Sequence, residues 1–136
     1  MILVDSNVLL DVFGQTSMWW EWSLRQLEDA AMHGPLLIND VIFAETSIRF
    51  ASIEVFEGAL TDAGITVAPI PRPALFLAGK ASVKYRMLGG VRSGVLPDFF
   101  IGAHAEVDNL PLLTRDVGRY RTYFPTVRLI APESEG

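Results

Sequence analysis

The most informative stretch of this sequence is residues 1–11, which read MILVDSNVLLD. The apolar run Ile2–Val4 has the character of a short buried strand, and it is followed at once by Asp5. In an open α/β sheet, ligands gather at the carboxyl ends of the strands, which is where Asp5 would lie. The alternative is a structural role, because Asp5 or Asn7 is also suited to cap a helix starting at Val8.

Short apolar runs of this kind alternate with longer helical patterns along the whole chain. Strands are predicted at Ile2–Val4, Pro35–Ile38, Ile65–Ile70, Leu110–Leu113 and Thr126–Ile130. These runs are apolar on both faces, as expected for parallel strands covered by helices. The order predicts an α/β protein, a three-layer α/β/α sandwich around a central, mostly parallel five-stranded sheet.

The intervening segments carry helical periodicity. One apolar stripe in the predicted helix of residues 17–33 consists of Trp20, Leu24, Leu27 and Ala31. Trp19 and Trp22 fall off this stripe, and exposed large aromatic side chains often mark interfaces. We therefore expect either a contact with a partner protein there or a helix buried on two sides.

Composition and charge limit the function classes. The 136 residues predict one domain spanning 1–136, and the absence of cysteine excludes disulfides and thiolate metal sites. No apolar run approaches the roughly 18 residues that span a bilayer, and no signal peptide is evident, so a cytoplasmic protein without membrane contact is expected. The net charge of −5 argues against an extended nucleic-acid surface, unless several acids bind divalent cations that invert the local field.

Glu45 is an acid on an apolar helix face. In the helix predicted from Asp40 to about Phe50, Val41 and Ile48 share its face. A carboxylate on an inward face is costly unless it is paired or bound to a metal. A salt bridge to Arg49, four residues on, is the alternative.

Two further acids occupy comparable positions. Asp98 lies in the first turn of an apolar helix opened by Pro97, where the helix dipole favours an acid in any case. Gly102, on the same side of that helix, leaves space beside Asp98. Asp116 follows the strand Leu110–Leu113, and capping of the next helix is its alternative role, with Thr114 as a competing cap.

Taken together, Asp5, Glu45, Asp98 and Asp116 predict a catalytic metal site at one edge of the sheet. Oxygen-only ligation is the preference of Mg²⁺ or Mn²⁺, which suits phosphodiester hydrolysis. Other chemistries lack their motifs, since neither GxGxxG nor GxxxxGK[ST] is present. His33 and His104 lack metal-ligand spacing, and His104 is expected to be a satisfied core histidine.

Three blocks of the sequence resemble the PIN-domain family, and in particular VapC-type toxins. The blocks are Val4–Asp11, Leu96–Ala105, and Leu112–Asp116 continued through Arg119–Arg121 to Phe124-Pro125; Glu45 matches the second acid by its order and helix context. The resemblance implies a PIN-like, Rossmannoid fold and a Mg²⁺- or Mn²⁺-dependent endoribonuclease. It also implies a toxin that acts on RNA, is neutralised by a small cognate antitoxin, and forms a homodimer.

The resemblance also assigns roles around the acids. Asn7 and Thr114 match polar positions that support the acid cluster, with local capping as their alternative. Arg92, in the glycine-rich segment 89–96, and Arg115 are candidates for contact with substrate phosphate. Asp11 is a further acid whose helix spacing favours a surface role.

A non-catalytic module is the alternative function, either a Mg²⁺-binding receiver-like domain or a PIN fold retained for assembly. A receiver-like domain would want a lysine after a late strand. The two lysines, Lys80 and Lys84, both fall inside one predicted helix, which opens at Pro73 and ends near Gly89-Gly90.

Overall fold

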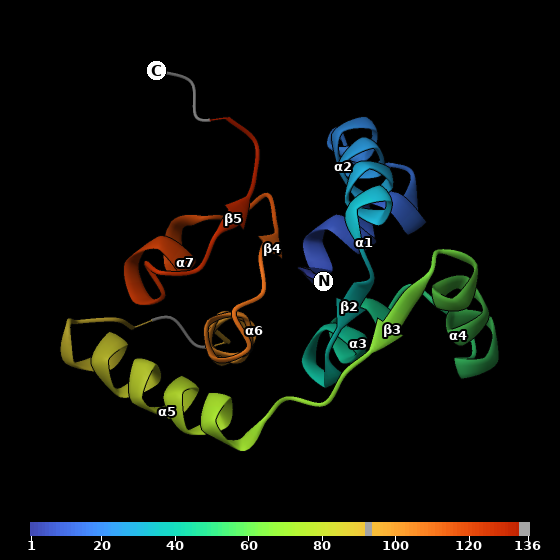
Figure 1. Cartoon of the computed structure of the whole chain (residues 1–136). Helices are drawn as coiled ribbons and strands as arrows, with labels where there is room; N and C mark the ends of the chain where they lie inside the picture. Colours follow the sequence, from blue (N-terminus) through green and yellow to red (C-terminus); the bar gives the residue numbers. More distant parts are fainter. Residues whose placement is uncertain (92–93, 134–136) are drawn as a thin grey trace.

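The computed structural model describes residues 1–91 and 94–133 (Figure 1). Five strands pair in parallel in the order β3-β2-β1-β4-β5. They are β1 (Ile2–Val4), β2 (Leu36–Ile38), β3 (Ile65–Val67), β4 (Leu112–Leu113) and β5 (Leu129–Ile130). The predicted five-stranded α/β/α fold is confirmed, although every strand except β1 is shorter than its apolar run.

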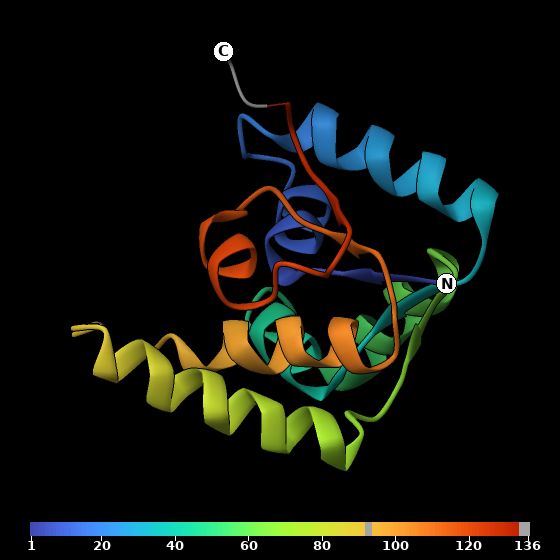
Figure 2. The same ribbon diagram turned by 60° about the vertical axis from the view of Figure 1, so that its left-hand side comes forward.

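Helices connect the strands and lie on both sides of the sheet (Figures 1 and 2). They are α1 (Ser6–Gly14), α2 (Trp20–His33), α3 (Asp40–Ser47), α4 (Ile53–Asp62), α5 (Arg72–Met87), α6 (Leu96–Val107) and α7 (Gly118–Tyr123). Three of them begin at a side-chain cap, because Asp5, Asn39 and Ser52 accept hydrogen bonds from backbone amides of α1, α3 and α4. Helices α5 and α6 run side by side (Figure 2).

The strand order changes direction at β1, although all strands are parallel. From the central β1 the chain proceeds outward to β2 and β3, then crosses back to β4 and β5. Val4 is in register with Leu113, and the amide of Asp5 donates to the Leu113 carbonyl at 2.9 Å. In open α/β sheets, ligands bind outside the carboxyl ends of the strands at the point where the strand order changes direction. Asp5 lies at this point.

The core lies between the sheet and the helices. The side chains of β1 and β4 at its centre, Leu3, Val4, Leu112 and Leu113, have no exposed surface. Close packing extends to α6, where a Cβ atom on Gly102 would lie 2.3–2.9 Å from the ring of Phe124. The space that the sequence predicts beside Asp98 is therefore filled by Phe124.

Helix α2 is rotated relative to the predicted stripe. Its buried residues are Ser23, Leu27 and Ala30, whereas Ala31 is exposed. The rotation turns Ser23 inward, where its hydroxyl donates to Asp11 at 2.7 Å. The residues after α2 also differ from expectation, because α3 ends at Ser47 and a separate helix, α4, follows it.

The two tryptophans that fall off the stripe are half-buried rather than exposed. Trp19 and Trp22 pack edge to face with ring centroids 5.9 Å apart, and Trp22 contacts the core. Their burial within the monomer favours the second of the two expectations. In the part of the chain that the structure describes, no helix is long and apolar enough to cross a membrane.

Candidate active site

Asp5 is the buried centre of the site. Only 3% of its surface is exposed, and it follows β1 directly. Its Oδ1 accepts the Ser6 amide at 2.7 Å, and its Oδ2 accepts the Thr114 hydroxyl at 2.9 Å and the Tyr120 hydroxyl at 2.8 Å. Asp5 therefore both caps α1 and belongs to the acid cluster, two roles that the sequence presented as alternatives.

Glu45 joins the cluster through Ser6. Its Oε1 accepts the Ser6 hydroxyl at 3.0 Å, which links α3 to the start of α1. Arg49, the alternative partner, places its guanidinium beside Gly14 instead. Glu45 is half-buried at the same edge as Asp5. The predicted inward face of α3 is nevertheless wrong, because the helix buries Ile42 and Thr46 and leaves Ile48 exposed.

Asp98 approaches the same edge from α6. Its carboxylate is paired with Arg119 of α7, and both side chains are partly exposed. Its negative charge contributes to the raised pKa values of both Asp5 and Glu45. Three of the four predicted acids are thus brought within electrostatic reach of one another.

Asp116 stands apart from these three acids. It is exposed, and its backbone is tied to Thr114, whose hydroxyl accepts the Asp116 amide at 3.1 Å. Asn7 donates to Thr114 at 3.1 Å and accepts the Arg115 amide at 3.3 Å. Asn7 and Thr114 therefore connect the ends of β1 and β4 around Asp5, and the Asp116 carboxylate lies at the rim.

Burial and the charge of Asp98 raise the proton affinity of Asp5 and Glu45. Burial, with a smaller contribution from the charge of Asp98, raises the pKa of Asp5 to about 6 despite its hydrogen bonds. Burial and Asp98 also raise the pKa of Glu45. The pKa of Tyr120 is raised well above its usual value by burial and then by the charges of Asp5, Asp98 and Glu45. The edge is a concentration of negative charge that a cation would stabilise.

A hard divalent cation fits this donor set by its chemistry. Asp5, Glu45 and Asp98 offer only carboxylate oxygens, and two of them carry raised pKa values. Within residues 1–91 and 94–133, however, no three acidic or histidine side chains are spaced to hold an ion as they stand. Arg119 neutralises Asp98 in this arrangement, so an ion that binds Asp98 has to compete with its guanidinium.

Arg115 and Asp11 form a second ion pair beside the site, with Asp11 buried and Arg115 partly exposed. Arg115 donates from Nε and Nη2 to the two oxygens of Asp11, at 2.8 and 3.1 Å, and lies 5.8 Å from the Trp19 ring. Asp11 is 2% exposed, so the predicted surface role of this acid is wrong. The guanidinium of Arg115 is already engaged, and Arg92, the other candidate phosphate contact, lies outside the described residues.

Sequence reasoning missed three residues of the site: Ser6, Tyr120 and Arg119. Ser6 stands between two residues that were singled out, so its hydroxyl had a local signal. Tyr120 and Arg119 lie on α7 and meet residues 115 and 21 positions earlier in the chain. Neither contact has a periodic signature in the sequence.

His104 is part of the core, as predicted. Its Nδ1 lies 3.1 Å from Asn39 Nδ2 and its Nε2 lies 3.2 Å from Asp108 Oδ2. Burial, opposed by Asp108, lowers the pKa of His104. The ring links α3 to α6 as a neutral hydrogen-bonding group.

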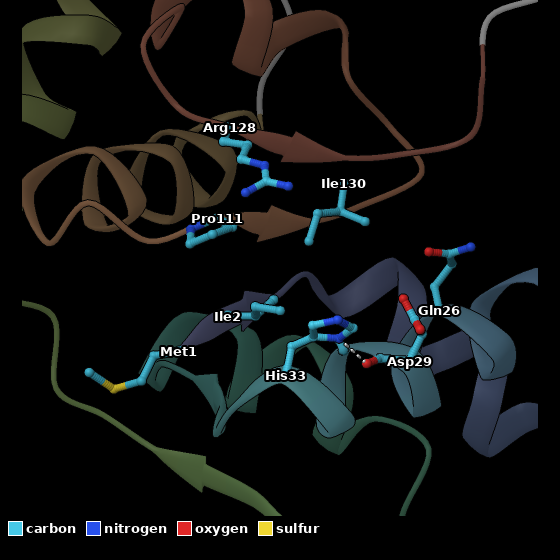
Figure 3. A pocket seen from close by; sticks show the side chains of 9 residues that line it. Met1, Ile2, Gln26, Asp29, His33, Pro111, Arg128 and Ile130 are labelled. Atoms are coloured by element: carbon cyan, nitrogen blue, oxygen red, sulfur yellow. Dashed lines mark hydrogen bonds between the residues drawn. The ribbon is translucent and has the colours of Figure 1, made fainter.

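A cavity of about 370 Å³ lies at the opposite edge of the sheet, near the amino ends of β1, β4 and β5 (Figure 3). Its lining includes Ile2, Asp29, His33 and Arg128, and His33 Nδ1 is bonded to the Asp29 carbonyl at 2.9 Å. None of the four predicted acids lines it. The cavity is therefore separate from the acid edge.

Comparison with solved structures gives similar folds. VapBC2 from Rickettsia felis, bound to a DNA fragment from its promoter, matches with a TM-score of 0.72 and 16% identity over 98% of this chain and 100% of that chain. FitAcB from Neisseria gonorrhoeae matches with a TM-score of 0.67 and 18% identity over 95% and 96% of the two chains. A toxin–antitoxin complex from Klebsiella pneumoniae matches with a TM-score of 0.61 and 20% identity over 88% and 90%.

No curated protein matches the chain in sequence. The family defined as the PIN domain matches residues 2–125, which include β1 to β4 and all four predicted acids. The match extends over most of the chain and agrees with the parallel sheet and the acids at its edge. The chain therefore belongs to the PIN-domain family.

Proposed function

We propose that this protein is a Mg²⁺- or Mn²⁺-dependent endoribonuclease whose metal is held by Asp5, Glu45 and Asp98, with Asp116 at the rim. The observation that carries the proposal is the convergence of three carboxylates at one sheet edge, where Ser6 bonds both Asp5 and Glu45 and the charge of Asp98 adds to the burial that raises the pKa of both. PIN domains are generally nucleases, which supports a hydrolase acting on phosphodiester bonds.

The residues of the chain have defined tasks in this reaction. Ser6, Thr114 and Tyr120 hold the Asp5 carboxylate in one orientation, and Ser6 also orients Glu45. When bound, the divalent ion supplies an activated water and neutralises charge on the phosphate oxygens. Arg119, once released from Asp98, would be free to contact a phosphate of the substrate.

The biological role we propose is that of the toxin in a type II toxin–antitoxin module. Support comes from the fold shared with the toxin–antitoxin complex of Klebsiella pneumoniae. The proposal includes a small cognate antitoxin, an RNA substrate, a homodimer and a cytoplasmic location. A neighbouring reading frame that encodes a small DNA-binding protein would support it further.

The decisive test is cleavage of defined RNAs with and without Mg²⁺ by the wild type and by Asp5→Asn and Asp98→Asn. Both variants are expected to abolish Mg²⁺-dependent cleavage and to retain the far-ultraviolet circular dichroism of the wild type. Asp62→Asn, an exposed acid of α4, is the matched control and is expected to leave cleavage unchanged. Undiminished cleavage by both site variants would exclude this active site.

The alternative, a non-catalytic Mg²⁺-binding or assembly module, predicts a different pair of results. Calorimetry would then detect Mn²⁺ binding that Asp5→Asn weakens, while no RNA is cleaved by the wild type. Lys80 and Lys84 both lie within α5, so neither follows a late strand as a receiver-like domain requires.

A further inference from the structure

A nuclease built on an acid cluster has to bind a polyanion that its own acids repel. The chain has a net charge of −5, and the sheet edge carries Asp5, Glu45 and Asp98. Affinity for nucleic acid comes largely from neutralisation of its phosphates by basic side chains. A basic surface adjoining the acids is therefore needed, and the inference below rests on the proposed nuclease function.

Helices α5 and α7 carry a concentration of basic residues near Asp98. Together they hold six of the eleven Lys and Arg residues of the chain and none of its sixteen Asp and Glu residues. Both helices pack on α6, which bears Asp98, and α7 lies near the later part of α5 (Figures 1 and 2). The positive charge of these helices thus borders the acid edge.

Aromatic rings join these basic side chains into one continuous surface. Lys84 Nζ lies 6.0 Å from the Tyr123 ring, and Arg119 Cζ lies 6.0 Å from the Tyr85 ring. The two tyrosine rings are 6.1 Å apart, and both also meet Phe99 of the core. We call Lys84, Tyr85, Arg119 and Tyr123 the basic aromatic strip.

The strip has the composition of a single-strand binding site and leads directly to the acids. Arg119 pairs with Asp98 at one end, while exposed Lys84 is at the other. Tyr123 is half-buried, and Phe99 and Tyr85 pack edge to face against its ring. Unpaired bases stack on such rings while basic side chains contact the phosphates. A paired base within a duplex is not free to stack on a side chain in this way.

We propose that the basic aromatic strip binds the single-stranded RNA next to the scissile bond, with Lys84 on a phosphate and Tyr123 against a base. Continuity with Asp98 favours nucleic acid over an acidic protein as the occupant, because a substrate strand lying across the acids has to continue onto a neighbouring surface. Lys84 and Tyr123 would then set affinity for the substrate without taking part in the chemistry.

The first test measures binding alone. Anisotropy of a fluorescent single-stranded oligouridine is followed without divalent ions in the Asp5→Asn background, where cleavage is not expected. Adding Lys84→Ala should weaken binding and lower the slope of log affinity against log salt by about 0.7, the value for one single-strand phosphate contact. Lys80→Ala is the matched control, because its ammonium lies over Phe76, one turn earlier on α5 and outside the strip.

The ring is tested separately from the charge. Tyr123→Leu should weaken oligouridine binding roughly 5- to 100-fold, whereas Tyr123→Phe keeps the stacking surface and should bind as the parent does. A melting temperature for each variant identifies any loss of folding, and Lys84→Ala, at an exposed position, serves if Tyr123→Leu does not fold. A duplex of the same length should bind with little dependence on Tyr123.

Cleavage kinetics separate this inference from the proposed function. In the otherwise wild-type protein, Lys84→Ala should raise KM several-fold and leave kcat unchanged, because the contact is outside the reacting centre. Absence of any RNA cleavage by the wild type would defeat the nuclease proposal. Normal cleavage together with unchanged KM, binding and salt slope in Lys84→Ala would overturn the strip, and would leave this surface to a protein partner.

Discussion

At the scale of single residues, burial and hydrogen bonding shift the pKa of Asp5 in opposite directions. It accepts hydrogen bonds that favour its charged form, yet burial and Asp98 keep its pKa near 6. The metal-free protein therefore holds a carboxyl group that titrates well above the usual carboxyl range. A bound divalent cation would stabilise the ionised carboxylate, whereas in the metal-free protein protonation removes its buried charge.

The pH dependence of stability follows from that raised pKa. The folded state binds the Asp5 proton more tightly than the unfolded state does, so the metal-free fold gains stability as the pH falls from about 7 through 6 towards 3.8. The full shift corresponds to about 3 kcal/mol, as an upper limit. Glu45 acts in the same direction.

Urea unfolding in a chelating buffer at a series of pH values measures this gain. Asp5→Asn removes the titrating group and should flatten the curve between about pH 7 and pH 5. Below the ordinary carboxyl range the trend should reverse. Burial raises the pKa of Asp11, but hydrogen bonds from Arg115, Ser23 and Ser17, together with the charge of Arg115, lower it below the usual value. These favourable interactions with the carboxylate are lost when Asp11 is protonated. Identical pH profiles for wild type and Asp5→Asn would refute this role for Asp5.

The Asp11–Arg115 pair gives an asymmetric prediction. Arg115→Ala leaves a buried, uncompensated carboxylate and should lower the free energy of unfolding by about 3–5 kcal/mol. Asp11→Asn leaves only a partly exposed arginine and should cost about 1.5–3 kcal/mol. Chemical denaturation measures both, and Asp11→Asn added to Arg115→Ala should recover part of the loss. A double variant less stable than Arg115→Ala would contradict the pairing as the cause.

At the scale of elements, α6 is fixed by a contact that tolerates no added atom. Gly102→Ala would push a methyl group into the Phe124 ring and should cost about 1–3 kcal/mol by overpacking. Because α6 carries Asp98, displacement of the helix should also weaken Mn²⁺ binding. Gly79→Ala in α5 is the control, since nothing lies within 4 Å of its added Cβ, and it should stabilise the protein by about 0.5–1 kcal/mol. Thermal melts of the two variants should therefore shift in opposite directions.

The elements also show which features of the fold are local enough to be predicted. Strands β1, β2 and β4 are apolar runs followed at once by a polar side chain, so these strands and the positions of Asp5 and Thr114 follow from short patterns. The bounds of the strands could not be predicted from these patterns, because a strand ends where its pairing with a neighbour ends. Only two residues of β4 pair with β5. The predicted orientation of α2 was wrong by a small rotation. The rotation brings Ser23 to Asp11, which lies on another helix, α1.

The same distinction applies to the candidate site. Glu45 was expected to point inward from its helix face, and the structure brings it to Ser6. Asp11 was assigned to the surface from its helix spacing, and its true partner, Arg115, lies 104 positions away in the chain and has no local signal. Tyr120 and Arg119 could not be assigned, since their partners are fixed by how α7 packs on the finished sheet.

At the scale of the whole molecule, the proposed metal site would couple stability to metal binding through one edge of the sheet. An ion that binds only the folded state should stabilise it by about 2.7 kcal/mol at a concentration one hundred times its dissociation constant. The melting temperature of the wild type should therefore rise with Mn²⁺ concentration, and that of Asp5→Asn should rise far less. Equal rises in both proteins would show that the ion binds elsewhere.

The hydrogen bonds to Asp5 also determine when activity can appear during synthesis. Thr114 and Tyr120 lie 109 and 115 positions after Asp5, so most of the chain has to be made before the carboxylate is held in place. A chain that ends before residue 112 has Asp5, Glu45 and Asp98 but neither β4 nor α7. Under the proposed function, such nascent or prematurely terminated chains should not cleave RNA, and cleavage should appear only once Tyr120 has been synthesised.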